Sequence, residues 1–288
     1  MKNRKNALRI FAIFLALVML TLSFTSCKEE KIADVRVMSY NILNPEWSST
    51  GETAESRVDG FFEVLTRYMP DVVGIQEASY LWHDVINGVL QEDDTYQFAC
   101  EKTYLFKDNM TTFLYNTKTV KLVNESIFDL DTGSDIRLFS VATFEKLSDG
   151  KQFIVTNVHP APSSREEEYP RQMSKFTDYA QYILEEYSDM PIIMTGDFNT
   201  KEQSEYYTNF LNDTGVKDAK YEAETLLRNY STWCGFDTKP KEGGKYCIDH
   251  IFVNSNLSVL NYDVVADDGV EKVSDHIPIY ADIIFNAE

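Results

Sequence analysis

The stretch Ser274-Asp275-His276-Ile277-Pro278-Ile279-Tyr280, close to the C-terminus, decides how the rest of this sequence is interpreted. It places an Asp-His pair at the start of an alternating apolar segment. Polar clusters of the same kind lie at the ends of other apolar runs: Gln76-Glu77, Asn157-Val158-His159, Gly196-Asp197-Phe198-Asn199 and Ile248-Asp249-His250. Because open α/β sheets build their sites at strand ends, the clusters together predict one site assembled from many strands.

Hydrophobic periodicity predicts the elements that carry these clusters. Strands are expected over 35–42, 71–75, 111–115, 137–147, 152–158, 191–195, 246–253 and 277–285, and helices over 57–68, 81–90 and 170–187. Asp149-Gly150 supplies a hairpin turn between two of the strands. Early alternation of strands and helices, followed by strand-rich segments, predicts a single α/β or mixed α+β domain of layered sheets over residues 34–288.

The N-terminus has the pattern of a secretion signal. Basic residues between Lys2 and Arg9 precede a short apolar run, Ile10–Leu22, and then Ser23-Phe24-Thr25-Ser26-Cys27. Small residues before a cysteine resemble a bacterial lipoprotein cleavage site, so we expect a signal peptide over 1–26, lipid on Cys27 and a short tether over 27–33. The protein would then be an exported cell-envelope lipoprotein, and the acidic start of the tether resembles signals for surface exposure. A plain signal peptide or a retained anchor is the alternative.

The charge balance of the chain is strongly acidic. The formal net charge of the 288 residues is −19, and removing the four basic residues of 1–26 leaves −23 for the remainder. Such a surface is poorly suited to tracking a nucleic-acid backbone by bulk attraction. A bound metal or a local basic loop can still reverse the field inside a cleft, so an anionic substrate is compatible with the composition.

The remaining cysteines do not have metal-site spacing. Cys100, Cys234 and Cys247 form no Cys-x-x-Cys or Cys/His pattern. In an exported protein Cys234 and Cys247 can form a disulfide, and two free buried thiols are the alternative.

The polar groups at the predicted strand ends fit metal-assisted hydrolysis of a phosphate ester. They are Asn41, Glu77, His159, Asp197, Asn199, Asp249, Asp275 and His276. Carboxylates and carboxamides without a Cys/His cage suit Mg²⁺, with Mn²⁺ as a second choice, and Glu77 is the main candidate ligand with Asn41 or Asp275 beside it. A histidine paired with a carboxylate is oriented and stabilised in its charged form, which favours displacement at phosphorus with acid/base assistance.

Each cluster taken alone has a structural alternative. Asn41 can cap a turn, Glu77 can pair with a surface lysine, and Gly196–Asn199 can be a simple turn. Among the histidines, His83 is expected on the surface of a helix. His250 alternates with Asp249 along a strand, so it would point to the opposite face and act as a packing residue.

Six motifs in order resemble the endonuclease/exonuclease/phosphatase superfamily, which includes deoxyribonucleases, abasic-site endonucleases, neutral sphingomyelinases and inositol polyphosphate 5-phosphatases. They are Ser39-Tyr40-Asn41-Ile42, Gln76-Glu77, Asn157-Val158-His159, Gly196-Asp197-Phe198-Asn199, Ile248-Asp249-His250-Ile251-Phe252 and Ser274-Asp275-His276-Ile277-Pro278. The resemblance covers about 34–285. It implies a four-layer sandwich of two mixed β-sheets flanked by helices.

The resemblance also implies a role for each residue. Glu77 would bind the metal with Asn41 and Asp275, and Asp197 would position or deprotonate the attacking water. Asn199 would orient the phosphate, and His276, polarised by Asp249, would stabilise the phosphoryl oxygens together with His159. Asn41 would also contact the substrate.

Two arginines and one loop each have two interpretations. Arg57 and Arg171 lie near positions that often carry arginine in the family, with Arg171 the candidate for binding substrate, or they form surface ion pairs. The segment from Ser231 through Trp233 to Lys245 is expected to read the substrate, or it is a solvated hairpin. Deoxyribonuclease-like members support the first histidine with an upstream acidic residue, which 108–112 does not clearly provide.

The sequence therefore predicts a secreted, lipid-anchored, monomeric phosphoesterase that uses a divalent metal and direct attack of water. A small phosphate ester or lipid head group is favoured over nucleic acid. An extracellular nuclease and a non-catalytic binding lipoprotein of the same fold are the alternatives.

Overall fold

A computed structural model describes residues 31–48, 51–100, 111–130 and 137–286. The contacts of the chain define a compact unit over Ala33–Glu288, separate from Met1–Ile32. The predicted signal peptide and the predicted lipidation site Cys27 lie outside the described residues, as does most of the 108–112 segment. Among the described residues, no helix combines the length and apolar character that a membrane span requires.

The compact unit contains two mixed β-sheets. The first has seven strands in the order β10 (Thr225–Arg228), β12 (Leu257–Val264), β13 (Ile279–Phe285), β1 (Val35–Asn41), β2 (Val72–Gln76), β4 (Thr112–Asn116) and β3 (Tyr96–Phe98). The second has six in the order β5 (Val120–Asp129), β6 (Leu138–Lys146), β7 (Gln152–Val158), β8 (Ile192–Asp197), β11 (Asp249–Val253) and β9 (Lys217–Asp218). In each sheet a central parallel pair, β1 with β2 and β7 with β8, is continued by an antiparallel partner.

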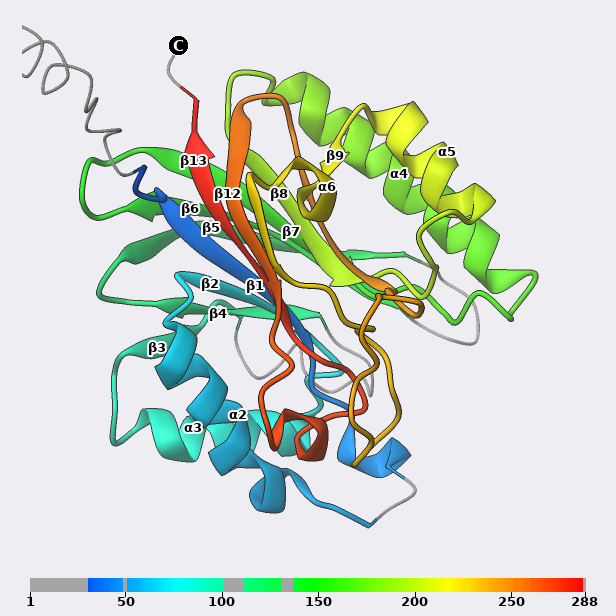
Figure 1. Cartoon of the computed structure of the whole chain (residues 1–288). Coiled ribbons are helices and arrows are strands. Elements are labelled where there is room, and N and C mark those ends of the chain that lie inside the picture. Colours follow the sequence, from blue (N-terminus) through cyan, green and yellow to red (C-terminus); the bar gives the residue numbers. More distant parts are fainter. Residues whose placement is uncertain (1–30, 49–50, 101–110, 131–136, 287–288) are drawn as a thin grey trace, which may run out of the picture. The chain divides into compact units, whose positions relative to one another are not determined.

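Helices cover the outer faces of both sheets, so the predicted four-layer sandwich is confirmed (Figure 1). The helices are α2 (Ala54–Tyr68), α3 (Tyr80–Leu90), α4 (Glu168–Glu186), α5 (Glu205–Thr214) and α6 (Ala219–Glu222), with short 3-10 turns η1 (Pro45–Trp47) and η3 (Val270–Lys272). Phe61 of α2 and Trp82 of α3 pack with the first sheet, and Phe176 of α4 and Phe210 of α5 pack with the second. Each helix therefore buries one apolar face against a sheet.

The ends of α2 illustrate how the local sequence fixes an element. The side chain of Thr53 accepts from the backbone of Ser56, and the Ser56 side chain accepts from the backbone of Thr53. This capping box starts the helix at Ala54, three residues before the predicted start. At the other end Met69 has a left-handed conformation with φ of 45°, and Pro70 follows.

Several elements were not expected from the sequence, and the longest of them are β5, β12 and α5. The alternation of β5 is broken by a register shift between Leu122 and Asn124, and α5 buries only Tyr207 and Phe210, so neither shows a clear periodic pattern. Conversely β11 begins at Asp249 rather than at 246, because the Tyr246 carbonyl accepts from the loop amides of Thr232 and Trp233.

The two sheets approach each other closely beneath the strand ends. Gln76 Nε2 donates to Asn157 Oδ1 at 2.6 Å, and Asn157 Nδ2 donates to the Ile75 carbonyl at 2.8 Å. A Cβ atom added to Gly74 would lie 2.2 Å from Thr195 Oγ1 on the opposing sheet. The absence of a side chain at Gly74 is therefore what permits this approach.

Replacing Gly74 by alanine tests the approach. We expect Gly74→Ala to lower the free energy of unfolding by about 1–3 kcal/mol, because the new methyl group forces Thr195 out of its hydrogen bond to the Thr156 carbonyl. Chemical denaturation measures the change.

Gly88→Ala is the matched control, because nothing lies within 4 Å of an added Cβ on this helical glycine. It should stabilise the protein by about 0.5–1 kcal/mol. Equal effects of both variants would contradict the tight sheet contact.

Candidate functional site

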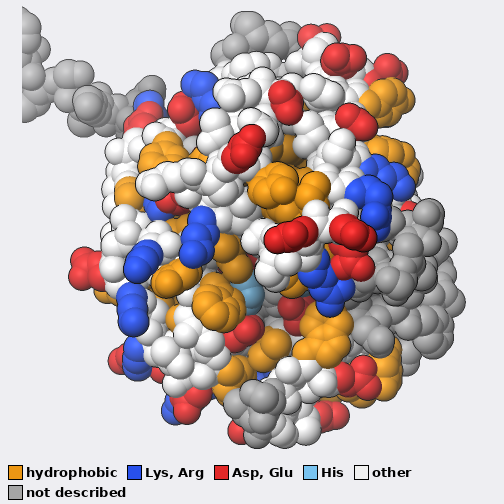
Figure 2. Space-filling model, turned by 90° about the vertical axis from the view of Figure 1, so that its right-hand side faces the viewer, with side chains coloured by type: hydrophobic (Ala, Val, Ile, Leu, Met, Phe, Trp, Pro, Cys, Tyr) orange, Lys and Arg blue, Asp and Glu red, His pale blue; other side chains and the backbone are white. Residues whose placement is uncertain are grey.

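The predicted site residues come together at one edge of the sandwich. Asn41 ends β1, Asp197 ends β8, and Asp249 opens β11 directly opposite Asp197. Glu77 and His159 follow β2 and β7, and His276 precedes β13. Figure 2 shows the face at this edge, where a histidine lies at the bottom of a hollow rimmed by hydrophobic, acidic and basic side chains. The strands of both sheets thus supply one site.

The carboxylate of Asp197 is the centre of the arrangement. Its Oδ2 atom lies 3.1 Å from Asn41 Nδ2, 3.3 Å from His159 Nε2 and 3.6 Å from His276 Nε2. Its Oδ1 atom accepts from the backbone amide of Asn199 at 2.9 Å. Since Asp197 is only 1% exposed, these groups replace water around a buried negative charge.

Neighbouring charges decide the protonation of this cluster. Burial alone would raise the pKa of Asp197, but His276 and His159 outweigh it and hold that pKa below its usual range. Burial alone would lower the pKa of His276, and the charges of Asp249 and Asp197 raise it well above the ordinary value. Asp197 is therefore ionised and His276 protonated around neutral pH.

Asp249 and His276 form the predicted pair. His276 Nδ1 lies 2.9 Å from Asp249 Oδ2 and 3.1 Å from Oδ1, and both residues are buried. Burial raises the pKa of Asp249 in spite of the positive charge on His276. The contact fixes the imidazole ring so that Nε2 points towards Asp197. This is the geometry of an oriented histidine at a reacting centre.

Glu77 has the environment of a metal ligand. It is buried, its Oε1 atom accepts from Asn41 Nδ2 at 3.0 Å, and its Oε2 atom accepts from the Asn44 amide at 2.7 Å. Both donors are neutral, and within the described chain no Lys, Arg or His forms an ion pair with Glu77. A buried carboxylate without a cationic partner fits a divalent cation, which oxygen ligands of this kind prefer. Asn44 was not anticipated, although an Asn-Pro step is a turn signal.

Backbone strain is concentrated around these ligands. Leu43, Glu77 and Asn199 all have positive φ values, of 54°, 61° and 50°. Residues other than glycine adopt this region at a cost, and it persists where surrounding contacts impose it. Leu43 and Asn199 are held in this conformation because their backbone amides donate to the side chains of Asn41 and Asp197.

Asp275 and Trp233 are also at the site. Trp233 pairs with His276 through an antiparallel backbone bridge, and its Nε1 atom donates to Asp275 Oδ2 at 3.2 Å. The Trp233 side chain is 42% exposed, so it offers an aromatic surface next to the catalytic candidates. Asn199 is turned to the opposite wall, where its Nδ2 atom donates to the Pro160 carbonyl at 3.0 Å.

The two arginines differ from one another. Arg57 is buried, and its guanidinium donates to the carbonyls of Ile42, Leu43 and Val273, so the expectation of a surface ion pair is wrong. Burial lowers the pKa of Arg57 to about 10. The Arg57 side chain links the loop after β1 to the segment before His276. Arg171 is exposed on α4, and its neighbour Gln172 accepts from the Ala161 amide after His159.

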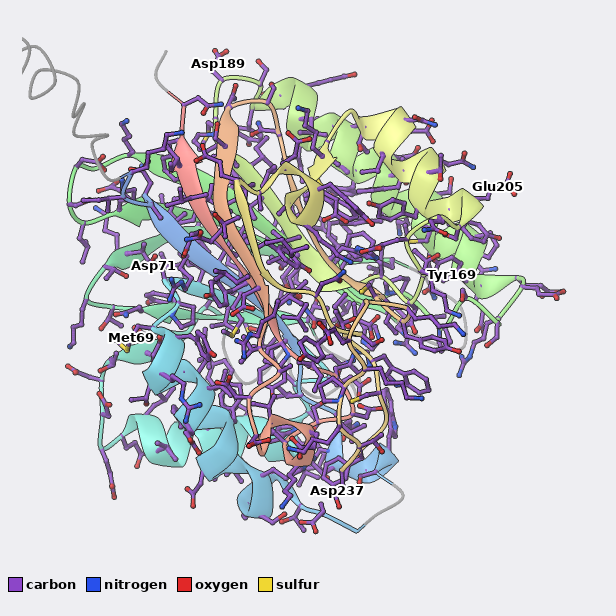
Figure 3. The ribbon with its side chains drawn as sticks, viewed as in Figure 1. Met69, Asp71, Tyr169, Asp189, Glu205 and Asp237 are labelled. Atoms are coloured by element: carbon purple, nitrogen blue, oxygen red, sulfur yellow. The ribbon has the colours of Figure 1, made fainter. Side chains whose placement is uncertain are left out.

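The N-terminal end of α4 is anchored to the same edge. Tyr169, labelled in Figure 3, is buried, and its hydroxyl donates to the carbonyl of Phe198 at 3.0 Å. Phe198 lies between the site residues Asp197 and Asn199, and its ring packs under α4 and α5. The loop that carries Asn199 is therefore fixed from below by the second apolar layer.

Two histidines lie outside the site. His250 is buried between Asp218 Oδ2 at 3.2 Å and the Thr200 carbonyl at 3.1 Å, as expected of a packing residue. His83 is buried and stacks on Phe98 at 4.7 Å, so the expectation of a surface position is wrong. The reason is that this face of α3 is covered by β3.

Among the residues that the structure describes, two groups of side chains bring metal-ligating atoms within 4.8 Å of one another. They are Asp197 with Asp249 and His276, and Glu202 with Asp218 and His250. In the first group the His276 imidazole already lies between the two carboxylates. In the second group Lys220 Nζ lies 2.6 Å from Glu202. Since positive charge is supplied in both, Glu77 remains the better metal ligand.

Cys100, Cys234 and Cys247 are free thiols, so the disulfide alternative is wrong. Cys234 Sγ points to the Asp275 carbonyl, whereas Cys247 Sγ lies near Lys220 Nζ and the carbonyl of Tyr230. Burial raises the pKa of Cys247 to about 11, which keeps this thiol protonated.

The sequence profile of the Endonuclease/Exonuclease/phosphatase family matches residues 38–276. The chain belongs to this family. Members of the family are metal-dependent hydrolases of phosphate esters, and this is the reaction class of the chain. No curated protein matches the chain significantly.

Solved structures of the same fold are distant in sequence. A mannosyl-6-phosphatase from Bacteroides thetaiotaomicron is 20% identical with a TM-score of 0.72, covering 87% of this chain and 100% of its own. The human Nocturnin catalytic domain with bound sulfate is 21% identical with a TM-score of 0.68, covering 88% and 93%. TDP2 from D. rerio in complex with a single-strand DNA product is 16% identical with a TM-score of 0.62, covering 86% and 98%. At these identities the likeness establishes the fold.

The pair of His250 and Asp218 makes stability depend on pH. Burial alone would lower the pKa of His250, but Asp218 raises it above the ordinary value of about 6.5. The pair therefore contributes stability in full below about pH 6.5, and the contribution is lost as the pH rises through the folded-state pKa. We expect the difference in unfolding free energy between wild type and His250→Gln to be larger at pH 5.5 than at pH 9. Denaturation at both pH values measures it, and a difference that grows with pH would contradict the ion pair.

Proposed function

We propose that this protein is an exported, lipid-anchored phosphatase that uses Mg²⁺ to hydrolyse a small phosphate ester by direct attack of water. The observation that carries the proposal is the buried Asp197 carboxylate, which two histidines and Asn41 surround beside the unpaired carboxylate of Glu77. A charged acid, an oriented imidazolium and a free carboxylate at one strand edge suit in-line displacement at phosphorus.

Glu77 would hold the cation, with Asn41 beside it and Asp275 completing the site. The carboxylate oxygens of Glu77 and Asp275 suit Mg²⁺ or Mn²⁺. Asn41 turns its Nδ2 group to Glu77, so its carboxamide oxygen would join the site only after a flip of the side chain. When bound, the cation polarises a phosphoryl oxygen and offsets its charge. Asn41 donates to both Glu77 and Asp197, so it fixes the position of the proposed metal ligand relative to the carboxylate that would position water.

The other residues act on the phosphate and the water. Because the pKa of Asp197 is held low, this carboxylate orients a water molecule and is a weak base. His276, held by Asp249, places positive charge where the phosphoryl oxygens develop negative charge, and His159 offers its Nε2 atom beside Asp197. Arg57 positions the segments on both sides of the site through backbone carbonyls.

The substrate class follows from the charge of the chain. A net charge of −19 works against binding a long polyanion, so a small ester is favoured over DNA or RNA. The fold is also that of a mannosyl-6-phosphatase, which supports a sugar phosphate. The sequence of residues 1–27 supports export and lipid attachment at Cys27.

Turnover assays separate the proposal from its rivals. The full-length protein should hydrolyse an aryl phosphate monoester in Mg²⁺ but not in EDTA, and His276→Ala should reduce kcat by about 100-fold or more because the imidazolium is lost. His83→Ala is a control for loss of a buried histidine away from the site. Preference for single-stranded DNA would favour the nuclease alternative, and metal binding without any turnover would favour the binding lipoprotein.

Removing the proposed metal ligand should weaken cation binding itself. We expect Glu77→Gln to raise the Mn²⁺ dissociation constant by about tenfold or more in titration calorimetry, because one buried negative charge is lost. Glu202→Gln is the matched control, since Lys220 already neutralises that carboxylate. If Glu202→Gln weakened binding and Glu77→Gln did not, the cation would belong to the other acidic cluster.

A further inference from the structure

An exposed aromatic corner lies beside the candidate catalytic residues. Trp233, paired through its backbone with His276, is followed along the surface by Tyr246, whose ring centroid lies 6.2 Å away at an interplanar angle of 70°. The two loops that carry them are joined, because the amides of Thr232 and Trp233 both donate to the Tyr246 carbonyl. The corner is therefore a built part of the wall next to the site.

Two lysines extend this corner away from His276. Lys201 Nζ lies 4.2 Å from the centroid of the Tyr246 ring, and Lys245 Nζ lies 5.6 Å from it. Lys201 follows the site residue Asn199 by two positions. Within the described chain neither lysine forms an ion pair, although Asp and Glu outnumber Lys and Arg by 46 to 27. Cations left without acidic partners in so acidic a protein create a local positive field.

The lysines also line a cavity of about 460 Å³. Its wall includes Lys201, Lys220, Lys245, Asn229, Gly243 and Gly244. Lys220 is already paired with Glu202, so Lys201 and Lys245 supply the free positive charge. Asn229 Oδ1 is buried and has no hydrogen-bond partner among the described atoms.

Gly244 packs closely against other residues of the cavity wall. It has φ of 62°, and an added Cβ atom would lie 2.5 Å from Asn229 Oδ1 and 3.1 Å from Lys220 Nζ. A side chain at this position would therefore press on the orphaned acceptor. The size of the cavity is within the range of small-molecule pockets.

We propose that Trp233, Tyr246, Lys201 and Lys245 form a leaving-group subsite for a phosphorylated sugar that carries a second anionic group. The inference rests on the proposed phosphatase function and names its substrate class. The sugar ring packs in the aromatic corner while its scissile phosphate reaches His276. The second anion lies at Lys201 and Lys245.

The geometry of the corner favours a sugar over a nucleobase. A flat base gains most when it stacks on an aromatic face, and two rings at 70° offer only one parallel face to it. A puckered sugar presents C–H groups in several directions and can contact both rings. The paired lysines add charge recognition that a neutral sugar would not require.

Comparing three substrates tests the subsite with the full-length protein in Mg²⁺. They are p-nitrophenyl phosphate, glucose 6-phosphate and glucose 1,6-bisphosphate. We expect kcat/KM for the bisphosphate to exceed that for the monophosphate by about tenfold. In the double variant Lys201→Gln/Lys245→Gln, the ratio of kcat/KM for the bisphosphate to that for p-nitrophenyl phosphate should fall by about tenfold, mainly through KM. The double variant Lys118→Gln/Lys151→Gln, which removes two exposed lysines elsewhere on the surface, is the charge-matched control and should leave the ratio unchanged.

Three other results would overturn the inference, each for a different reason. An unchanged ratio in the double variant, with turnover of p-nitrophenyl phosphate intact, would remove the subsite and leave the proposed phosphatase function standing. A preference for ADP over both sugars that is lost in Tyr246→Ala would assign the corner to a nucleobase. No turnover of any of the esters by a folded, Mn²⁺-binding protein would overturn the phosphatase function and the subsite with it.

Discussion

The buried negative charge of Asp197 is the constraint on which the site depends. A carboxylate that is 1% exposed is unfavourable unless donors replace water around it. These donors come from both sheets, with Asn41 on β1, His159 after β7 and His276 before β13. The charge therefore ties the ends of three strands and their loops together. The same demand holds His276 in its charged form, which is the form that stabilises phosphoryl oxygens.

Close contact between the sheets is what brings those strand ends within reach of one another. Gly74 leaves room for Thr195, and Gln76 Nε2 donates to Asn157 Oδ1 in the layer directly beneath the site. Gln76 and Asn157 belong to the sequence motifs that led to the family, yet their contacts are structural. The left-handed backbone at Glu77 is the visible cost of the arrangement. The rigid strands and the hydrogen bonds together impose this backbone conformation, so the Glu77 carboxylate is held in one orientation.

Local charge and overall charge have different roles in this protein. The chain as a whole is strongly acidic, which disfavours long polyanions. Beside the site, Lys201 and Lys245 lie against the Tyr246 ring and form no ion pair within the described residues. They supply local positive charge next to the carboxylates of the site, in a chain that is acidic overall.

The sequence by itself determined the layered α/β fold, the strand ends that carry the site and the pairing of Asp249 with His276. It could do so because strand alternation and motif order are local and linear properties. Only the tertiary structure decided that Arg57 is buried against carbonyls, that His83 is covered by β3, and that Lys201 and Lys245 meet at Tyr246. Burial and ion pairing depend on which distant segments pack together, and no local pattern encodes that contact.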